Sequence, residues 1–370
     1  MRSNLDFTHE QKIVRRPHSV APTLANVNLI LVVQAQTVPV YGSGMGLSIT
    51  SLMTSMVLRR AGVECHVWTL ANAEQLKQKL SAYEYAKDRP ITHVVINTPG
   101  FIGPLDYGIL ATSWPDINFV MLNHTGLAYL SIDHDGWRNI EWDLSLQISS
   151  DNVFVAGNNP RFAASILAQD GVPALWLPNL YDTTTFRPLR APRTAYSPLR
   201  IGSFAEGRPW KNQLVAAQAA LAIARDLDAD LELYVNQDRW VETRALSEAR
   251  RQLFENRLPQ AKLIEVPWQS WSLFLRTVES MDLLLYASFD EAFGMIPADG
   301  LAVGVPSVTS GALEWTPHTW QAPNVWDPAS LTIIGLALLH GRLSAVQSGR
   351  EALANYVKLG TQRWIDFLVS

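Results

Sequence analysis

The sequence has little cysteine, few charged residues and no long apolar run, and each shortage excludes a class of protein. The single cysteine, Cys65, excludes an internal disulfide framework and a zinc site built on cysteines, and we expect it to be a buried structural thiol. Charged residues are only 17% of the 370 positions, and the formal net charge is −4. That balance argues against nucleic-acid binding through overall charge, although it leaves room for a local basic cleft.

The sequence also shows neither a targeting segment nor a membrane-spanning segment. The most apolar early stretch, at 27–33, is far shorter than the roughly 20 residues that a spanning helix needs. The first residues are polar and mixed in charge, without the apolar core of a signal peptide. We therefore expect a cytoplasmic protein with no membrane span, in which residues 1–26 form a polar N-terminal arm.

Hydrophobic residues make up 48% of the chain, which is enough for two domains with their own cores. Strand-like and helix-like segments alternate, as is typical of a parallel sheet with helices on both faces. A proline-rich segment at 181–198 separates two such series and indicates a linker. We expect doubly wound, Rossmann-like α/β domains at 27–180 and 199–345. The clearest strands are expected at 27–33, 63–68, 91–97, 118–122, 199–204, 231–235, 262–266 and 283–286, and the clearest helices at 48–60, 212–225, 271–278 and 351–368.

Ligands of such sheets bind beyond the carboxyl ends of the strands, and a glycine-rich turn at 41–46 follows the first strand. Closely spaced glycines let the backbone approach a ligand, and the following helix N-terminus favours an anion. We predict contacts from Gly44 and Gly46 to a phosphate or sugar, the alternative being a plain tight turn. The dinucleotide-binding pattern needs a third glycine where Leu47 stands. Since Glu64 lies where a ribose-binding acid would, a dehydrogenase stays open as a weaker alternative.

A second candidate site lies at 202–212, where a strand ends at Phe204 and a helix starts near Asn212. The loop between them carries Arg208 and Lys211. Two cations beside a helix N-terminus suit a diphosphate, whereas the blander alternative is a solvated charged loop. The chain has 13 tryptophans, which we expect mainly to pack in cores; Trp210, in this loop, is a candidate for lining a cleft.

The third and most informative site is the block 291–308. Glu291 and Asp299 stand eight positions apart, on either side of a loop and the first turns of a helix. Glu291 can meet a sugar held in the loop, while Asp299 can accept hydrogen bonds from a ribose diol. The backbone amides around Phe293 and Gly294 can face a phosphate.

This block resembles the E-x7-E motif of retaining GT-B glycosyltransferases of the family-4 type. Asp299 departs from it, since the family usually has Glu there and Asp is one methylene shorter. The segment at 202–212 resembles the family's donor-phosphate loop, with Lys211 matching its lysine and Arg208 its arginine, and the glycine turn resembles its N-domain loop. The residues of the block that match the motif are Glu291, Phe293, Gly294, Ala302, Gly304, Pro306 and Val308.

His124 follows an N-domain strand, and a lone histidine there is either structural or functional. The resemblance implies a histidine beside the donor sugar, where an imidazole hydrogen-bonds a hydroxyl group or stabilises charge. The triplet Asp133-His134-Asp135 imitates the metal-binding D-x-D motif of the other glycosyltransferase fold. Two domains and the block at 291–308 favour a metal-independent enzyme instead.

The resemblance implies a GT-B fold with an acceptor-binding N-domain, a donor-binding C-domain and a C-terminal helix at 346–370 that crosses back to the N-domain. It implies transfer of a sugar from a nucleotide-diphosphate sugar to an acceptor hydroxyl group with retention, without a metal or other cofactor. The acceptor is open: a glycan, a lipid-linked sugar, a small molecule or modified DNA. A phage-type DNA glycosyltransferase acting on hydroxymethylated bases is one alternative, in which Lys12, Arg15 and Arg16 of the arm touch DNA. A sugar-nucleotide epimerase and a non-catalytic nucleotide-sugar binder are the others.

Overall fold

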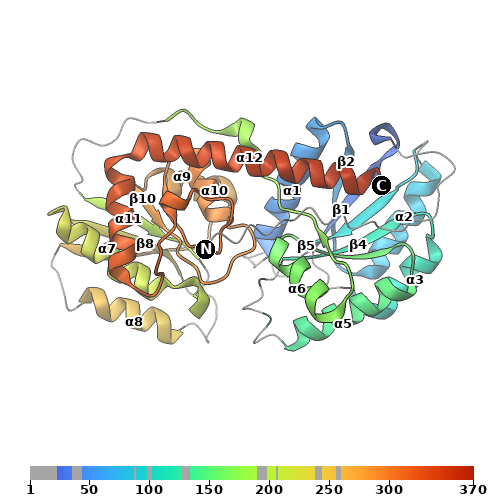
Figure 1. Ribbon diagram of the computed structural model, residues 1–370, viewed down its shortest axis with the longest axis horizontal. Helices are drawn as coiled ribbons and strands as arrows, with labels where there is room; N and C mark the ends of the chain where they lie inside the picture. Colours follow the sequence, from blue (N-terminus) through green and yellow to red (C-terminus); the bar gives the residue numbers. More distant parts are fainter. Residues whose placement is uncertain are drawn as a thin grey trace.

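The computed structural model describes residues 23–35, 44–86, 89–97, 102–124, 126, 130, 134–189, 198–205, 207–237, 244–255 and 260–370. These residues form two parallel β-sheets with helices packed around each, side by side in an elongated molecule (Figure 1). The two sheets and their helices confirm the α/β fold class expected from the sequence. Most of the N-terminal arm, the linker residues 190–197 and the start of the glycine turn lie outside the described residues.

The first sheet has six parallel strands in the order β2-β1-β3-β4-β5-β6. Strand β1 lies between β2 and β3, and its apolar run is buried on both faces. Ile30 and Val32 join the core on one face of the sheet, while Leu29 and Leu31 join the core on the other, because side chains alternate along a strand. Cys65 is buried on β2, as expected. The strands are β1 (Asn28–Gln34), β2 (Glu64–Leu70), β3 (His93–Ile96), β4 (Asn118–Asn123), β5 (Val153–Gly157) and β6 (Leu175–Trp176).

Helices connect these strands and cover the sheet. Helix α6 shows how the sequence sets a boundary: Asn159 caps it by accepting the backbone N–H of Arg161, Pro160 occupies the first turn, and Gly171 ends it in the left-handed conformation. The described helices of this half are α1 (Gly44–Arg60), α2 (Ala73–Ala86), α3 (Pro104–Ser113), α5 (His134–Ser149) and α6 (Pro160–Asp170).

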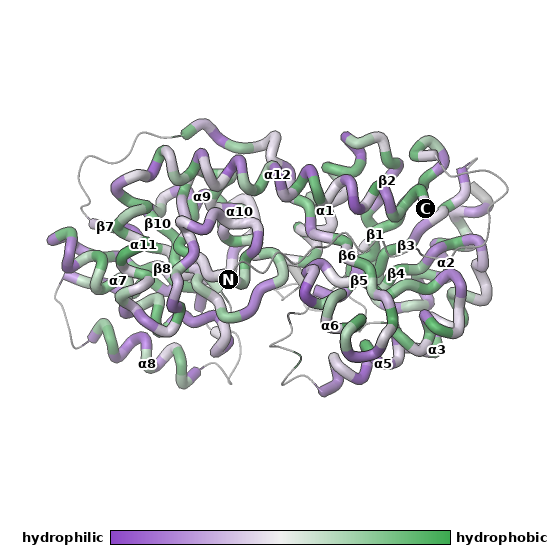
Figure 2. The backbone as a smooth tube through the Cα atoms, in the orientation of Figure 1, coloured by the Kyte–Doolittle hydropathy of each residue, from purple (hydrophilic) through white to green (hydrophobic). Residues whose placement is uncertain are grey.

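The second sheet has five parallel strands in the order β11-β10-β7-β8-β9. Among the described residues its core is the largest apolar cluster, and the alanine-rich face of α7 packs into it. The tube coloured by hydropathy shows apolar segments concentrated in the interior of both halves (Figure 2). The strands are β7 (Leu199–Ser203), β8 (Leu231–Asn236), β9 (Ala261–Val266), β10 (Leu283–Leu285) and β11 (Ser307–Val308); the helices are α7 (Gln213–Asp226), α8 (Arg244–Glu255), α9 (Trp271–Glu279), α10 (Met295–Val303) and α11 (Pro328–His340).

The last helix, α12 (Arg342–Leu368), runs along both halves (Figure 1). Its first part packs Val346 and Leu353 into the core of the second half. Its last turns bury Trp364 and Phe367 in the core of the first half, and the Trp364 indole N–H donates to the Pro178 carbonyl at 2.8 Å. The helix therefore ties the two halves together, while the domain limits drawn from the sequence remain a prediction.

In the described part of the chain, no single helix has the length and apolar composition to span a bilayer. The pair α11 and α12 passes that test only when the two are taken together, and they are bent by 103° at their junction.

Candidate functional site

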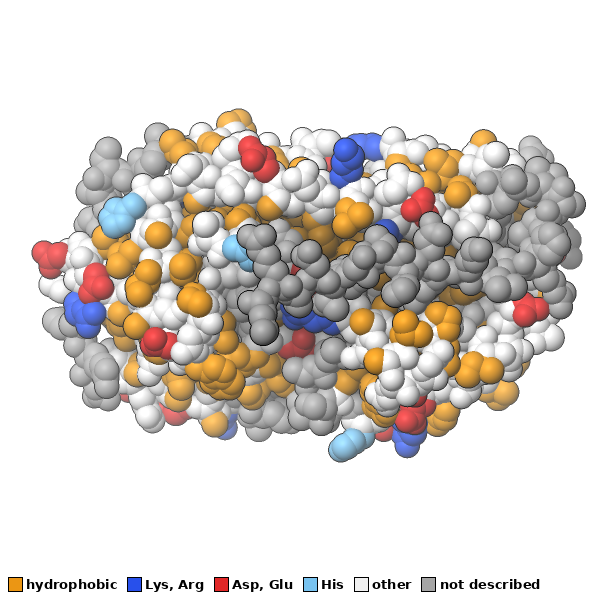
Figure 3. Space-filling view, viewed as in Figure 1, with side chains coloured by type: hydrophobic (Ala, Val, Ile, Leu, Met, Phe, Trp, Pro, Cys, Tyr) orange, Lys and Arg blue, Asp and Glu red, His pale blue; other side chains and the backbone are white. Residues whose placement is uncertain are grey.

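A cavity of about 380 Å³ lies between the two halves, within the size range of small-molecule sites. On the face in Figure 3, some of the visible Lys and Arg side chains lie in the middle of the molecule, between the halves. Gly44, which begins α1, and Trp210 are not among the residues lining this cavity, whereas every other residue that the sequence predicted for the site lines it. These are Gly46, His124, Arg208, Lys211, Glu291, Phe293, Gly294 and Asp299.

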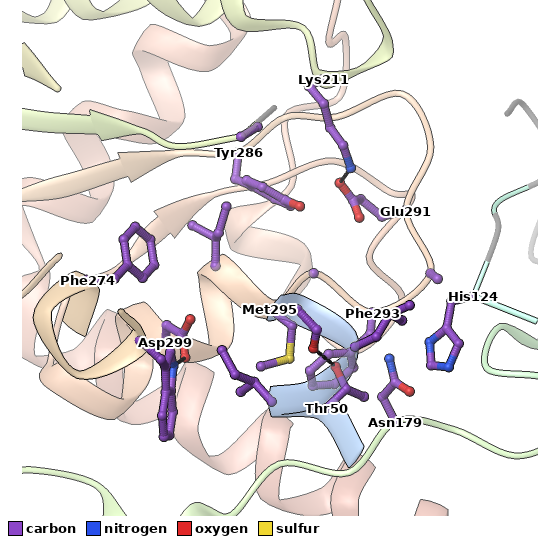
Figure 4. A pocket seen from close by; sticks show the side chains of 18 of the residues that line it. Thr50, His124, Asn179, Lys211, Phe274, Tyr286, Glu291, Phe293, Met295 and Asp299 are labelled. Atoms are coloured by element: carbon purple, nitrogen blue, oxygen red, sulfur yellow. Dashed lines mark hydrogen bonds and ion pairs between the residues drawn. The ribbon is translucent and has the colours of Figure 1, made fainter. Parts of the chain in front are cut away.

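Lys211 and Glu291 form an ion pair in the cavity wall (Figure 4). Lys211 ends the short 3₁₀ helix η4 (Pro209–Lys211), and Glu291 lies in the loop after β10. Both side chains are largely buried, and Lys211 Nζ also lies 5.8 Å from the ring centroid of Tyr286. Burial, with the Glu291 carboxylate nearby, raises the pKa of Tyr286 well above its usual value. The pair therefore presents a fixed cation and a fixed anion at one point of the cavity.

The backbone conformation of Asn212 positions Lys211. Asn212 has a left-handed conformation with φ 55°, between η4 and the start of α7, and asparagine tolerates that region better than most residues. Its buried side-chain amide donates to the carbonyl of Ala287 at 3.1 Å and to that of Val325 at 2.7 Å. Arg208, before η4, also lines the cavity, and its guanidinium lies 5.6 Å from the centroid of the Trp210 ring.

Helix α10 points its N-terminus into the cavity, where Gly294 and Met295 line the wall. Gly294 has φ 74°, and a Cβ there would lie 2.6 Å from a side-chain atom of Leu313. Glycine therefore suits the left-handed backbone, and a larger residue would have to displace the buried Leu313 side chain. Phe293 is buried between the rings of Trp315 and Tyr356, with centroids 5.8 and 5.7 Å away. The free amides of this turn can face an anion.

Asp299 lies one turn further along α10 and is held by two donors. Its Oδ1 accepts hydrogen bonds from the Tyr181 hydroxyl at 2.8 Å and from the Trp271 indole N–H at 3.0 Å. The residue is only 3% exposed, and burial raises the pKa of its carboxyl group to about 7, against the lowering effect of the two donors. Aromatic side chains from the segment after β6 and from the start of α9 thus fix the Asp299 carboxyl group.

His124 follows β4 and lies between two asparagines. The Asn158 amide donates to Nδ1 at 2.9 Å, and Nε2 lies 3.1 Å from Asn97 Oδ1. These partners assign the hydrogen to Nε2, which donates to Asn97. Burial lowers the pKa of His124 to about 4, so the ring is neutral at physiological pH. Both ring nitrogens are thus hydrogen-bonded. By contrast, Asn158 Oδ1 and Asn97 Nδ2 are buried without a hydrogen-bond partner.

Sequence reasoning missed a second group of residues, which joins the halves. The Asn159 amide donates to the Glu291 carbonyl at 2.9 Å, and Arg161 donates to the Gly311 carbonyl at 2.8 Å and pairs with Glu314 at 2.8 Å. The capping signal Asn159-Pro160 directly after a strand was available as a clue. Tyr181 and Trp271 carry no local signal, because their partner Asp299 is distant in the sequence.

The remaining candidates lie elsewhere. Glu64 on β2 accepts from Arg89 at 2.8 Å and bonds His66 at 3.1 Å, and it is not among the residues lining the cavity. His134 begins α5, and Asp135 pairs with Arg138 at 2.6 Å. Asp133 of the D-x-D triplet, together with Lys12, Arg15 and Arg16, falls outside the described residues. Within the described ranges, no group of three or more His, Cys, Asp or Glu side chains could hold a metal ion.

Comparison with known proteins gives a fold. No protein-family model matches the chain, and no curated protein matches it by sequence. Among solved structures, it resembles a glycosyltransferase from Rickettsia africae, with a TM-score of 0.62 and 13% identity over 93% of this chain and 98% of that one. Sucrose-phosphate synthase from Thermosynechococcus elongatus gives a TM-score of 0.62 and 13% identity over 92% and 98%. HepE from Anabaena, solved with UDP and glucose, gives 0.57 and 14% over 92% and 97%. At such identities the likeness shows the fold alone, and that fold is GT-B, as expected.

Proposed function

Proceeding from the GT-B fold, we propose that this protein is a glycosyltransferase that moves a sugar from a nucleoside-diphosphate sugar to an acceptor hydroxyl group. The observation that carries the proposal is the convergence of Arg208, Lys211 and Glu291 on one cavity between the two halves. The crystals of HepE, which has a similar fold, contain UDP and glucose. Retention of configuration and independence of metal rest on the family-4 resemblance of the block at 291–308.

In this mechanism the cations act on the leaving group. When the bond from the anomeric carbon to the diphosphate breaks, negative charge grows on the diphosphate oxygens. Lys211 and Arg208 both line the cavity and are proposed to neutralise that charge, while the amides at the start of α10 add a partial positive charge. A diphosphate in the cavity competes with Glu291 for Lys211, so the carboxylate becomes available to a sugar hydroxyl group.

The nucleoside is proposed to lie on the side of Asp299. Trp268, Trp271 and Phe274 line this side of the cavity and offer apolar surface for a base. Figure 4 shows Phe274 and Asp299 together on one side and His124 on the other. With Oδ1 of Asp299 occupied by Tyr181 and Trp271, the other carboxyl oxygen is the one proposed to accept from a ribose hydroxyl group.

The transferred sugar is proposed to lie between Glu291 and His124. The neutral His124 ring does not supply positive charge there, because burial keeps its pKa at about 4. The network instead leaves one buried acceptor, Asn158 Oδ1, and one buried donor, Asn97 Nδ2. Asn158 lines the cavity, whereas Asn97 is not among its lining residues, so Asn158 Oδ1 alone is proposed to accept from a sugar hydroxyl group.

A thermal-shift screen of UDP-, GDP- and ADP-sugars tests the proposal. We expect at least one to raise the melting temperature of the wild type, because a ligand that binds only the folded state stabilises it. Lys211→Ala should lose this shift. Lys358→Ala, which removes an exposed lysine from α12, is the matched control and should keep it.

Product analysis then separates the alternatives. Transfer to a glycan, lipid-linked sugar or hydroxymethylated DNA identifies a transferase and its acceptor, whereas a changed donor without any acceptor indicates an epimerase. A donor that binds but is never converted indicates a non-catalytic binder. A shift with NAD alone would support the dehydrogenase, and the absence of a shift with every nucleotide sugar would refute our proposal.

A further inference from the structure

An exposed tryptophan is presented on the second half of the molecule. Trp326 lies in the loop between the 3₁₀ helix η6 (His318–Trp320) and α11, and it is 71% exposed. One face of its ring stacks on Phe289, with ring centroids 4.0 Å apart and planes 24° from parallel. A tryptophan that stays in water forgoes most of the burial that usually stabilises it, so its place calls for an explanation.

The loop that carries Trp326 is fixed on both sides of the ring. Before it, the Val325 carbonyl accepts from the buried Asn212 amide at 2.7 Å. The Trp326 backbone N–H donates to Asn324 Oδ1 at 3.1 Å. After it, Asp327 caps α11 by accepting from the Ala329 backbone N–H at 2.9 Å. The ring is therefore presented in a set position, which lowers the ordering cost of binding.

The stacked pair lies next to the proposed donor site. The Phe289 backbone N–H donates to the Trp210 carbonyl at 2.9 Å, and the Ser288 hydroxyl donates to the same carbonyl at 2.9 Å. Trp210 directly precedes Lys211, and Phe289 stands two residues before Glu291. Neither Phe289 nor Trp326 lines the cavity itself. The Trp210 carbonyl thus links Phe289, and with it the stacked pair, to the segment that carries Lys211. The pair itself lies outside the cavity.

The chemistry of the surface favours a sugar ring over a nucleic acid. An aromatic face packs against the C–H groups of one face of a pyranose. Asp327 directly follows Trp326 and is exposed, with one carboxylate oxygen on the α11 cap and the other in water. Carboxylates accept hydrogen bonds from hydroxyl groups, but they repel a phosphate backbone.

We propose that the Phe289–Trp326 pair is a saccharide-binding subsite, which holds a sugar unit of a glycan acceptor by stacking on Trp326. This proposal rests on the proposed function and names its acceptor class. The glycan would extend from the reacting hydroxyl group in the cavity past Glu291, which lines the cavity wall, to Trp326. A sugar unit distant from the reaction centre would then contribute affinity without taking part in the chemistry.

Binding of defined oligosaccharides tests the subsite directly. Maltotetraose, cellotetraose and chitotetraose are each added to the full-length protein, and saturation-transfer NMR measures contact and affinity. We expect at least one to bind, Trp326→Ala to weaken it about tenfold through loss of an aromatic anchor, and Trp326→Phe to retain part of the binding. The matched control is Trp142→Ala, which removes an exposed tryptophan that is 42% accessible on α5 of the other half and should change nothing.

The outcomes separate this proposal from the proposed function. Saccharide binding needs no donor, and the donor-induced thermal shift of Trp326→Ala should equal that of the wild type. If oligosaccharides bind through Trp326 but none of the nucleotide sugars binds the protein, the subsite is supported and the proposed transferase is refuted. The subsite is refuted if none of the three saccharides binds, if Trp326→Ala binds like the wild type, or if that variant also loses its donor shift. Binding of a single-stranded oligothymidylate through Trp326 in their place would refute it as well.

Discussion

Replacing Asp299 with asparagine should change how the stability of the protein depends on pH. Burial raises the pKa of Asp299 to about 7 in the folded protein, whereas an unfolded aspartate titrates near 3.9. Between these two values the folded state binds more protons at this site than the unfolded state. The free energy of unfolding therefore falls as the pH rises through this window, and the loss is complete above the folded pKa.

The magnitude follows from the width of that window. It spans about three pH units at about 1.4 kcal/mol each, which gives an upper limit of about 4 kcal/mol. Asparagine keeps an oxygen that can accept from Tyr181 and Trp271 and does not titrate. The variant should thus lack this loss, and its stability relative to the wild type should rise from pH 4 to pH 7.

Urea unfolding of both proteins at several pH values between 4 and 8 measures the effect. Other titrating groups, such as the buried Asp143, whose pKa burial also raises to about 7, are present in both proteins. They cancel in the difference between the two curves. If the difference does not change with pH, the carboxyl group is ionised throughout, and the burial argument for Asp299 is wrong.

Three further predictions concern the cavity wall. Glu291→Gln should lower the free energy of unfolding by about 3 kcal/mol, because it leaves Lys211 largely buried without its counter-charge. The variant should also abolish transfer in a product assay, and turnover at the wild-type rate would contradict the proposed contact of Glu291 with the sugar. His124, with a pKa of about 4, should show no NMR titration near pH 6.5, and the stability it contributes should fall as the pH drops from 6.5 towards 4, because only the unfolded state takes up the proton there. Gly294→Ala should lower the free energy of unfolding, measured by thermal melts, by at least about 1 kcal/mol, because of its φ of 74° and the overlap with Leu313. Gly103→Ala, where a Cβ meets nothing within 4 Å, should lower it little, and equal losses in the two variants would refute the backbone argument.

Local sequence patterns predicted much of the fold. The run expected as a strand at 118–122 is β4 (Asn118–Asn123), and the helix expected at 271–278 is α9 (Trp271–Glu279). Both follow from apolar periodicity, which depends only on neighbouring residues. Helix ends were less accurate: α12 begins at Arg342, before the expected C-terminal helix at 346–370 and its clearest part at 351–368. Its early turns are determined by packing on the second half, which periodicity alone does not show.

Several residues of the cavity wall could be predicted for similar reasons. Arg208, Lys211, Glu291 and Gly294 follow strands of one parallel sheet, so their side of the sheet was predictable. Their partners were not. Asp299 meets Tyr181, which is 118 positions away. Such contacts depend on how the two halves meet, and a single sequence holds no local record of that.

The central claim is that cations in the cavity between the two halves bind a diphosphate. Calorimetric titration of UDP, GDP and ADP into the wild type, Lys211→Ala and Lys358→Ala tests it directly. We predict that the wild type and Lys358→Ala bind at least one of these nucleotides with equal affinity, and that Lys211→Ala binds it roughly 10- to 100-fold more weakly, through loss of a charged hydrogen bond. Equal affinity in all three proteins, or no binding to any of them, would contradict the claim.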